Sequence, residues 1–118
     1  MTTTDRIVVL SIDRPERRNA LNLDALEDLD AAVRSAVAEG ARVIVLTGTD
    51  GHFCAGADLK ELEDVSFTER LAEVLRHLAG VPITTIAAIE GSCMGLGMQL
   101  AVACDVRKKA DSEACTKA

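Results

Sequence analysis

ARVIVLTGTDGHFCAGADLKEL, residues 41–62, decides the fold, because it passes from a strand through a loop of small residues into an acidic helix start. Residues 41–46 form a near-continuous apolar run of strand length, which is typical of a strand covered on both faces. The loop then carries Cys-Ala-Gly-Ala at residues 54–57. Small side chains allow close approach of another group to the backbone. This group is either another part of the protein or a ligand.

The residues before this corner complete a strand–helix–strand unit. Residues 6–12 are rich in β-branched side chains and stop before a proline, which predicts a strand. Asn22 can cap a helix that ends at Gly40. The helix has one apolar face, formed by Leu26, Leu29, Val33 and Val37. Strand, helix and strand in this order predict a right-handed parallel crossover.

Two helical segments are expected after the loop. A short acidic helix is predicted around residues 58–63. A second helix is predicted from Ser66, because Ser66 and Glu69 have the spacing of a capping box. Its apolar face is formed by Leu71, Val74, Leu75 and Leu78. The spacing of these residues indicates a helix that packs on one side only.

A second corner of the same kind occupies residues 83–104, ITTIAAIEGSCMGLGMQLAVAC. A buried strand over residues 83–89 leads through a Gly-rich loop into a buried helix over residues 98–104. Such corners expose backbone N–H groups that suit a carbonyl or anionic oxygen, and two converging corners make an oxyanion hole. The alternative is that the small residues only permit tight packing of helix on strand, as in many α/β proteins.

Composition excludes several classes of partner. The 118 residues are 48% hydrophobic and 27% charged, as expected for one globular domain. The net charge of -6 argues against nucleic acid and against anionic membranes, since both need a concentrated positive field. The uncharged apolar stretch of residues 79–89 is too short for membrane insertion. Residues 91–97 match neither common nucleotide-binding glycine motif.

The cysteines predict neither a metal site nor disulfides. No two of them have C-x-x-C spacing, and the sequence has only two histidines to join them. Cys54, Cys93 and Cys104 lie in apolar or Gly-rich runs, which favours reduced thiols in a cytoplasmic protein. No signal peptide is visible at the amino terminus. Cys54 is not expected to be a nucleophile, because no histidine is placed by the sequence as its partner.

Three ordered segments resemble the enoyl-CoA hydratase/isomerase (crotonase) family: RPERRNALN, VIVLTGTDGHFCAGADLKEL and PITTIAAIEGSCMGLGMQLAVACDVR. The resemblance covers residues 6–107. Within the family, the sequence is most similar to a bacterial enoyl-CoA hydratase paralogue. It implies a crotonase-like α/β fold of repeated β-β-α units, of which this chain is the N-terminal half. It also implies a homo-trimer or hexamer acting on coenzyme A thioesters in fatty-acid metabolism, with no permanently bound cofactor.

The resemblance also implies site residues in both corners. The backbone N–H groups of Ala57 and Leu96 would bind the thioester oxygen; many family members have glycine at the second position, but a backbone donor survives that change. The residues expected to face coenzyme A are Ala55, Ala57, Asp58, Leu59, Lys60 and Arg18. For the two basic side chains, an ordinary solvated position is the open alternative.

Gln99 stands where related hydratases have their first catalytic glutamate. An amide can orient a water, but it cannot accept a proton near neutral pH, and loss of a general base costs a factor of about 10²–10⁴ in rate. Three functions therefore stay open: an enoyl-CoA hydratase, a catalytically impaired acyl-CoA-binding protein, and a structural fragment without a ligand.

The family pattern stops at Arg107. Residues 1–107 are expected to form the acyl-CoA-binding domain, and residues 108–118 a polar tail without strand pattern. Because family members are longer, the chain is expected to be a fragment or to join two pieces around a missing middle. Either way, one face of its strands would stay uncovered, which favours a requirement for partner subunits or further chain.

Overall fold

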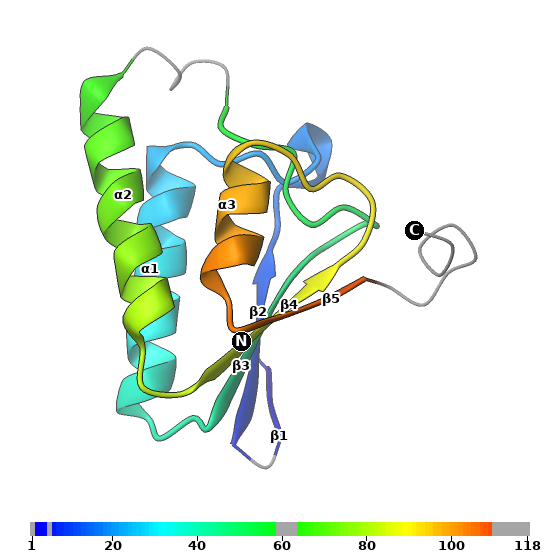
Figure 1. The fold of residues 1–118 in the computed structure, drawn as a ribbon. Coiled ribbons are helices and arrows are strands. Elements are labelled where there is room, and N and C mark those ends of the chain that lie inside the picture. Colours follow the sequence, from blue (N-terminus) through cyan, green and yellow to red (C-terminus); the bar gives the residue numbers. More distant parts are fainter. Residues whose placement is uncertain (1, 5, 59–63, 110–118) are drawn as a thin grey trace.

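The computed structural model describes residues 2–4, 6–58 and 64–109. Most of the expected acidic helix at residues 58–63 thus lies outside the described residues. The elements follow the chain in this order (Figure 1): β1 (Thr2–Thr4), β2 (Ile7–Ile12), the 3-10 helix η1 (Pro15–Arg17), α1 (Leu23–Ala38), β3 (Val43–Gly48), α2 (Val65–Gly80), β4 (Thr84–Ile89), α3 (Leu96–Ala103) and β5 (Val106–Lys109).

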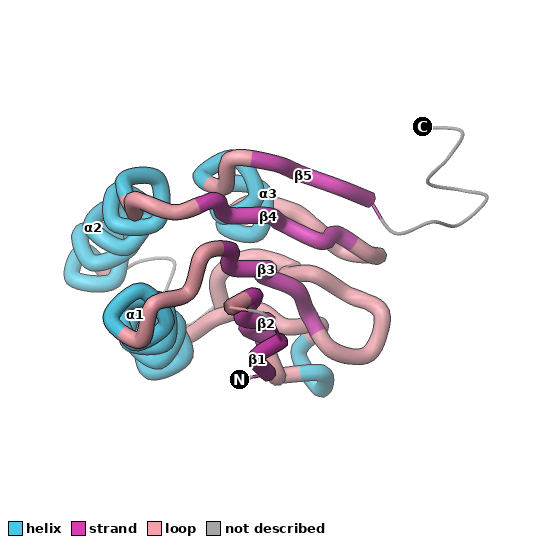
Figure 2. The backbone as a smooth tube through the Cα atoms, turned by 90° about the horizontal axis from the view of Figure 1, so that it is seen from below, coloured by secondary structure: helices cyan, strands magenta, loops and turns pink. Residues whose placement is uncertain are grey.

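The described strands form one sheet in the order β1-β2-β3-β4-β5, which Figure 2 shows as successive neighbours. Strands β2 to β5 are parallel, and β1 pairs antiparallel with the start of β2. The parallel pairing of β2 with β3 around α1 confirms the expected parallel connection, with Ile7 opposite Val43. A parallel sheet brings the carboxyl ends of its strands to one edge, where both small-residue corners begin.

The core lies between the helices and one face of the sheet. Alternate strand residues point into it and are buried: Val8, Leu10, Ile12, Ile44, Leu46, Thr85 and Ala87. Among the helices, α2 contacts both α1 and α3. On the other face, register aligns four apolar residues that are half-buried or exposed: Val9, Val45, Ile86 and Val106. This open sheet face matches the expectation of a face without full cover.

The prediction that Asn22 caps a helix is confirmed. The predicted start of the next helix is wrong. Asn22 Oδ1 accepts the N–H of Ala25 at 2.9 Å and caps α1. The cap of α2 is Asp64, whose Oδ1 accepts the N–H groups of Ser66 at 2.8 Å and Phe67 at 3.4 Å. Ser66 therefore lies inside the first turn, and the capping box predicted from Ser66 does not exist. A carboxylate two residues earlier already satisfies the free N–H groups.

Two edge strands were not predicted. The segment from Val106 to Lys109 forms β5, so the prediction of no strand pattern from Lys108 onward is wrong for Lys108 and Lys109. Parallel pairing with β4, from Ile86 opposite Val106 onward, supplies the backbone hydrogen bonds, and lysines are common on edge strands. Strand β1 is likewise short and polar. Both segments lack the apolar pattern of a strand. They are strands because each forms backbone hydrogen bonds with an adjacent strand, β1 with β2 and β5 with β4.

Candidate functional site

The two small-residue corners lie side by side and are joined through their backbones. The N–H of Phe53 donates to the carbonyl of Glu90 at 2.7 Å, and that of Cys54 to the carbonyl of Ser92 at 2.9 Å. The N–H of Met94 returns a hydrogen bond to the Cys54 carbonyl at 3.2 Å. We call these three bonds the corner ladder. It holds the loop after β3 against the loop after β4.

Gly97 allows the closest approach between the corners. A Cβ at residue 97 would lie 2.2 Å from the carbonyl oxygen of Cys54 and 2.9 Å from its Cβ. No side chain fits in that space, so α3 can begin against the first corner only with glycine there. Tight backbone packing is therefore one reason for the small residues.

The two predicted donors, Ala57 and Leu96, occupy equivalent places in their corners. Each follows a glycine with positive φ, Gly56 at +127° and Gly95 at +52°. Neither N–H group donates a hydrogen bond to another of the described residues. Both residues line one pocket of about 330 Å³. The fold thus brings two unpaired backbone donors, 39 positions apart in sequence, to the wall of one cavity.

Helix α2 also lines this pocket. It contributes Phe67, Thr68 and Leu71, while Gln99 reaches the pocket from the first turn of α3. The sequence reasoning missed the α2 residues as a part of the site. The sequence shows the apolar face of the helix, but not that its first turns line the same pocket as the corners.

Asp58 is tied to the loop before α1. Its Oδ2 lies 3.6 Å from Arg14 Nη2 and 3.8 Å from Arg17 Nη1, and the side chain is only 8% exposed. Its N–H donates to the carbonyl of Leu21 at 2.8 Å, beside the bridge between Leu21 and Ala57. These contacts hold the backbone next to Ala57 against the loop before α1.

The other residues expected to face coenzyme A are only partly described. Ala55 lines the pocket, and its N–H donates to the carbonyl of Arg18 at 3.1 Å. Arg18 is exposed, with a left-handed backbone (φ 51°) that turns the loop beside the first corner. Leu59 and Lys60 lie outside the described residues, so their expected contacts stay predictions.

Cys54 is a packing residue. It is fully buried, and burial raises the pKa of its thiol to about 11, which keeps it protonated at neutral pH. Its Sγ lies 3.7 Å from the carbonyl oxygen of Gly56. The nearby His52 instead accepts the N–H of Ser92 through Nδ1 at 3.0 Å. These contacts agree with the expectation that Cys54 is not a nucleophile.

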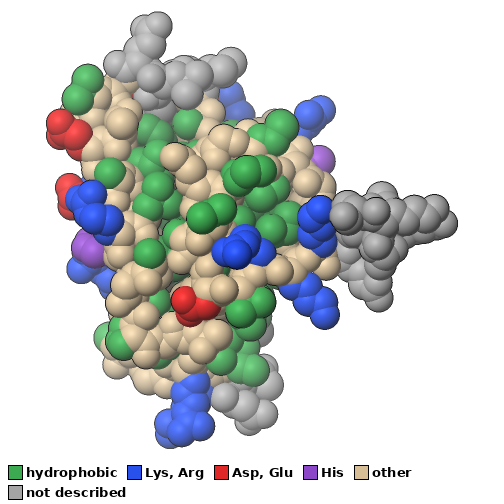
Figure 3. Space-filling model, in the orientation of Figure 1, with side chains coloured by type: hydrophobic (Ala, Val, Ile, Leu, Met, Phe, Trp, Pro, Cys, Tyr) green, Lys and Arg blue, Asp and Glu red, His purple; other side chains and the backbone are tan. Residues whose placement is uncertain are grey.

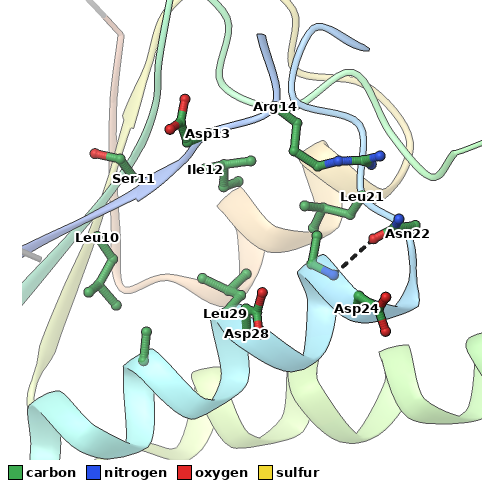
Figure 4. A pocket seen from close by; sticks show the side chains of 12 residues that line it. Leu10, Ser11, Ile12, Asp13, Arg14, Leu21, Asn22, Asp24, Asp28 and Leu29 are labelled. Carbon is green, nitrogen blue, oxygen red and sulfur yellow. Dashed lines mark hydrogen bonds between the residues drawn. The ribbon is translucent and has the colours of Figure 1, made fainter. Parts of the chain in front are cut away.

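A larger pocket, of about 500 Å³, lies between β2 and α1 and shares no lining residue with the first (Figure 4). Its walls are apolar at Leu10, Ile12 and Leu29, and acidic side chains stand at its rim. None of the predicted site residues lines it. The smaller pocket, which Ala57 and Leu96 both line, is the candidate site.

The family model described as enoyl-CoA hydratase/isomerase matches residues 2–117 of this chain. The chain belongs to the enoyl-CoA hydratase/isomerase family. One relative, “Probable enoyl-CoA hydratase echA6” of Mycobacterium tuberculosis, is 41% identical over 91% of this chain and 44% of its own length. The mitochondrial methylglutaconyl-CoA hydratase of Mus musculus is 39% identical over 90% of this chain and 36% of its own length.

Solved structures of family members have the same fold. An enoyl-CoA hydratase from Thermoplasma volcanium superposes with a TM-score of 0.86 at 32% identity, covering 92% of this chain and 46% of the other. A structure described as a probable enoyl-CoA hydratase from Mycobacterium thermoresistibile gives 0.84 at 33% identity, covering 92% and 47%. This chain therefore corresponds to the N-terminal half of a crotonase-like fold. Among the described residues, no helix is long and apolar enough to cross a bilayer.

Proposed function

We propose that the pocket between the two corners binds the acyl thioester of a coenzyme A substrate, in an enzyme of the enoyl-CoA hydratase type that acts in fatty-acid metabolism. The observation that carries this proposal is the shared position of Ala57 and Leu96. Both follow a positive-φ glycine, both have an unpaired N–H among the described residues, and both line the same pocket. In this proposal the two N–H groups bind the thioester carbonyl oxygen.

The two donors would act by stabilising charge on that oxygen. Reactions next to a thioester carbonyl pass through an enolate-like state, in which the oxygen gains negative charge. Fixed backbone donors stabilise such charge without reorganising, and one donor is worth a factor of about 10²–10³ in rate. The corner ladder supports this role, because it holds both loops to each other through main-chain bonds.

Gln99 favours a second candidate function, a thioester-binding protein with weak hydration. Its side chain is exposed at the pocket, one turn from the proposed donor Leu96. An amide orients water but cannot take its proton. No carboxylate lines the pocket within the part of the chain that the structure describes. Binding and enolate stabilisation would then persist, while the addition of water is slow.

Crotonyl-CoA hydration by the native protein and by Gln99→Glu tests both functions. We expect both proteins to bind the thioester, and the carboxylate to raise the hydration rate by a factor of about 10²–10⁴, measured as loss of the conjugated-thioester absorbance. Gln99→Leu is the matched control, since it removes the polar group without adding a base. Rapid hydration by the native protein would mean that another residue supplies the base. Absence of any acyl-CoA binding would overturn the ligand assignment.

We also propose that the family assembly is a homo-trimer or hexamer in the cytoplasm. Exposed apolar side chains on α3 support subunit contacts, and the free thiols of Cys54, Cys93 and Cys104 fit a reducing compartment. Size-exclusion chromatography with light scattering tests the assembly.

A further inference from the structure

Two cysteines lie opposite each other in the corner ladder. Cys54 belongs to the first corner and Cys93 to the second, and the two residues are paired in an isolated parallel β-bridge. Two bonds of the ladder flank this pair. The N–H of Cys54 donates to the carbonyl of Ser92 at 2.9 Å, and the carbonyl of Cys54 accepts the N–H of Met94 at 3.2 Å. Backbone hydrogen bonds therefore hold the two cysteines side by side.

This placement meets the backbone requirements of a disulfide. Paired residues of adjacent strands lie about 4.8 Å apart, within the Cα separation of about 4.4–6.8 Å that disulfides span. Paired residues also point their side chains to the same face of the ladder. Burial is the main cause of the raised pKa of the Cys54 thiol, and the Cys93 thiol adds to it, as expected of two thiols close together.

The difference in burial decides which thiol meets an oxidant first. Cys54 is fully buried, whereas Cys93 is half-buried. Burial raises the pKa of both thiols, so only a small fraction of each is the reactive thiolate at neutral pH. The pair is therefore slow to react, and Cys93 is the thiol that an oxidant in solution can reach.

We propose that Cys54 and Cys93 form a reversible oxidation site, at which a peroxide converts the two thiols into one disulfide across the corner ladder. The Cys93 sulfur attacks hydrogen peroxide, breaks the O–O bond and becomes a sulfenic acid, while the other oxygen leaves as water. The Cys54 sulfur then attacks the Cys93 sulfur, and the S–O bond breaks with release of a second water. The two thiols together lose two electrons and two protons, and the peroxide is reduced to water.

The proximity of the two sulfurs offsets the low ionisation of Cys54. With a pKa of about 11, about one Cys54 thiol in 10⁴ is ionised at pH 7. Groups held in a reactive geometry behave as if at effective concentrations of about 10⁵ M or more, which compensates for so small a fraction. The second step is a reaction with a neighbouring side chain, so it needs neither exposure of Cys54 nor a histidine partner.

Peptide mapping of the native protein after treatment with hydrogen peroxide tests this proposal. Remaining thiols are blocked with iodoacetamide, and the protein is digested with trypsin without reductant. Cys54 lies in the tryptic peptide of residues 43–60 and Cys93 in that of residues 77–107. We expect these two peptides to be joined with the loss of two hydrogens, and dithiothreitol to separate them.

Two variants identify the partner, because the second peptide also contains Cys104. Cys93→Ser should abolish the link. Cys104→Ser is the matched control and should keep it, since Cys104 is buried directly after α3 and is paired with no cysteine among the described residues.

Three results would overturn the proposal: a native protein that forms no such link, a link from Cys93 to Cys115 in its place, or a link that survives Cys93→Ser. None of these measurements involves an acyl-CoA ligand, so the oxidation site and the proposed function can fail independently.

Discussion

At the scale of single residues, Gly97 is the position with the least room. The carbonyl of Cys54 occupies the space where a Cβ would lie. We expect Gly97→Ala to lower the free energy of unfolding by about 1–3 kcal/mol, the usual cost of overpacking, and to weaken acyl-CoA binding because the corners are forced apart. Urea unfolding and titration with butyryl-CoA measure the two effects.

Gly80→Ala is the control for this substitution. Gly80 ends α2, and a Cβ there would meet nothing within 4 Å. Alanine is favoured over glycine in a helix, so this change should leave stability unchanged or raise it by up to about 1 kcal/mol. Equal effects of the two alanines would show that the contact with Cys54 is not restrictive.

From the sequence, the residues in the two corners of the candidate site could be predicted, whereas the residues that α2 adds to the pocket could not. The resemblance to the family assigns Ala57 and Leu96 through motifs that are local in sequence, and both line the pocket, while their role as donors stays a prediction. Phe67 and Thr68 could not be assigned to the pocket, because their place depends on how α2 crosses the corners. The expectation that Asp58 faces coenzyme A stays a prediction; its carboxylate lies 3.6 Å from Arg14 Nη2 and is mostly buried. The positions of these residues depend on packing between segments that are far apart in the sequence.

At the scale of elements, α1 and α2 are joined by charged side chains around Asp30. This residue is buried on α1, and its carboxylate lies 2.7 Å from Arg70 Nη2 and 3.2 Å from His77 Nδ1, both on α2. Arg34 on α1 adds a contact of 3.1 Å, and Arg70 also pairs with Glu27. Burial raises the pKa of Asp30, but the hydrogen bonds from Arg70, Arg34 and His77 outweigh it and bring the pKa below its usual 3.8.

This arrangement predicts acid-dependent stability. Because the pKa of Asp30 is lower in the folded than in the unfolded protein, its stabilisation is complete above pH 3.8 and is lost as the pH falls through the folded value. Asp30→Asn should cost about 1.5–3 kcal/mol at pH 7, the range for hydrogen bonds to charged groups, and less as the pH falls below 4. Urea unfolding from pH 7 to pH 3 measures the difference.

Asp28→Asn provides the comparison for Asp30, since Asp28 is exposed on the same helix. It should change stability by no more than about 0.5 kcal/mol at any of these pH values. The explanation is wrong if both variants show the same dependence on pH.

Element types were predictable from periodicity, while several element ends were not. Helix α1 and strands β2, β3 and β4 follow from apolar patterns together with a cap or a proline. The start of α2 was misplaced because both Asp64 and Ser66 are good caps, and sequence alone does not show which one the chain uses. Strands β1 and β5 lack an apolar pattern and exist through pairing with their neighbours.

At the scale of the whole molecule, apolar side chains gather on the outer surface of α3, as the hydrophobic groups in the middle of Figure 3 show. Met98 and Val102 on α3 are 55% and 64% exposed, and Met94 in the loop just before α3 is 58% exposed. We call them the α3 stripe. A continuous exposed apolar stripe of this kind is typical of an interface.

The α3 stripe predicts self-association. Met98→Lys should shift the protein toward smaller species in sedimentation velocity, because it places a charge in the middle of the stripe. Val65→Lys is the matched control, since Val65 is an equally exposed apolar residue (69%) at the start of α2, outside the stripe. A monomeric native protein, or the same shift in both variants, would contradict this interface.

The corner ladder has a consequence for how this protein can diverge. Its bonds run from main chain to main chain, so they do not depend on which side chains stand at Ser92 or Met94. Under the proposed function, mutation can therefore exchange side chains at the pocket, as at Gln99, while the proposed hold on a carbonyl oxygen is inherited unchanged. A descendant that lost one reaction would keep the means to acquire another.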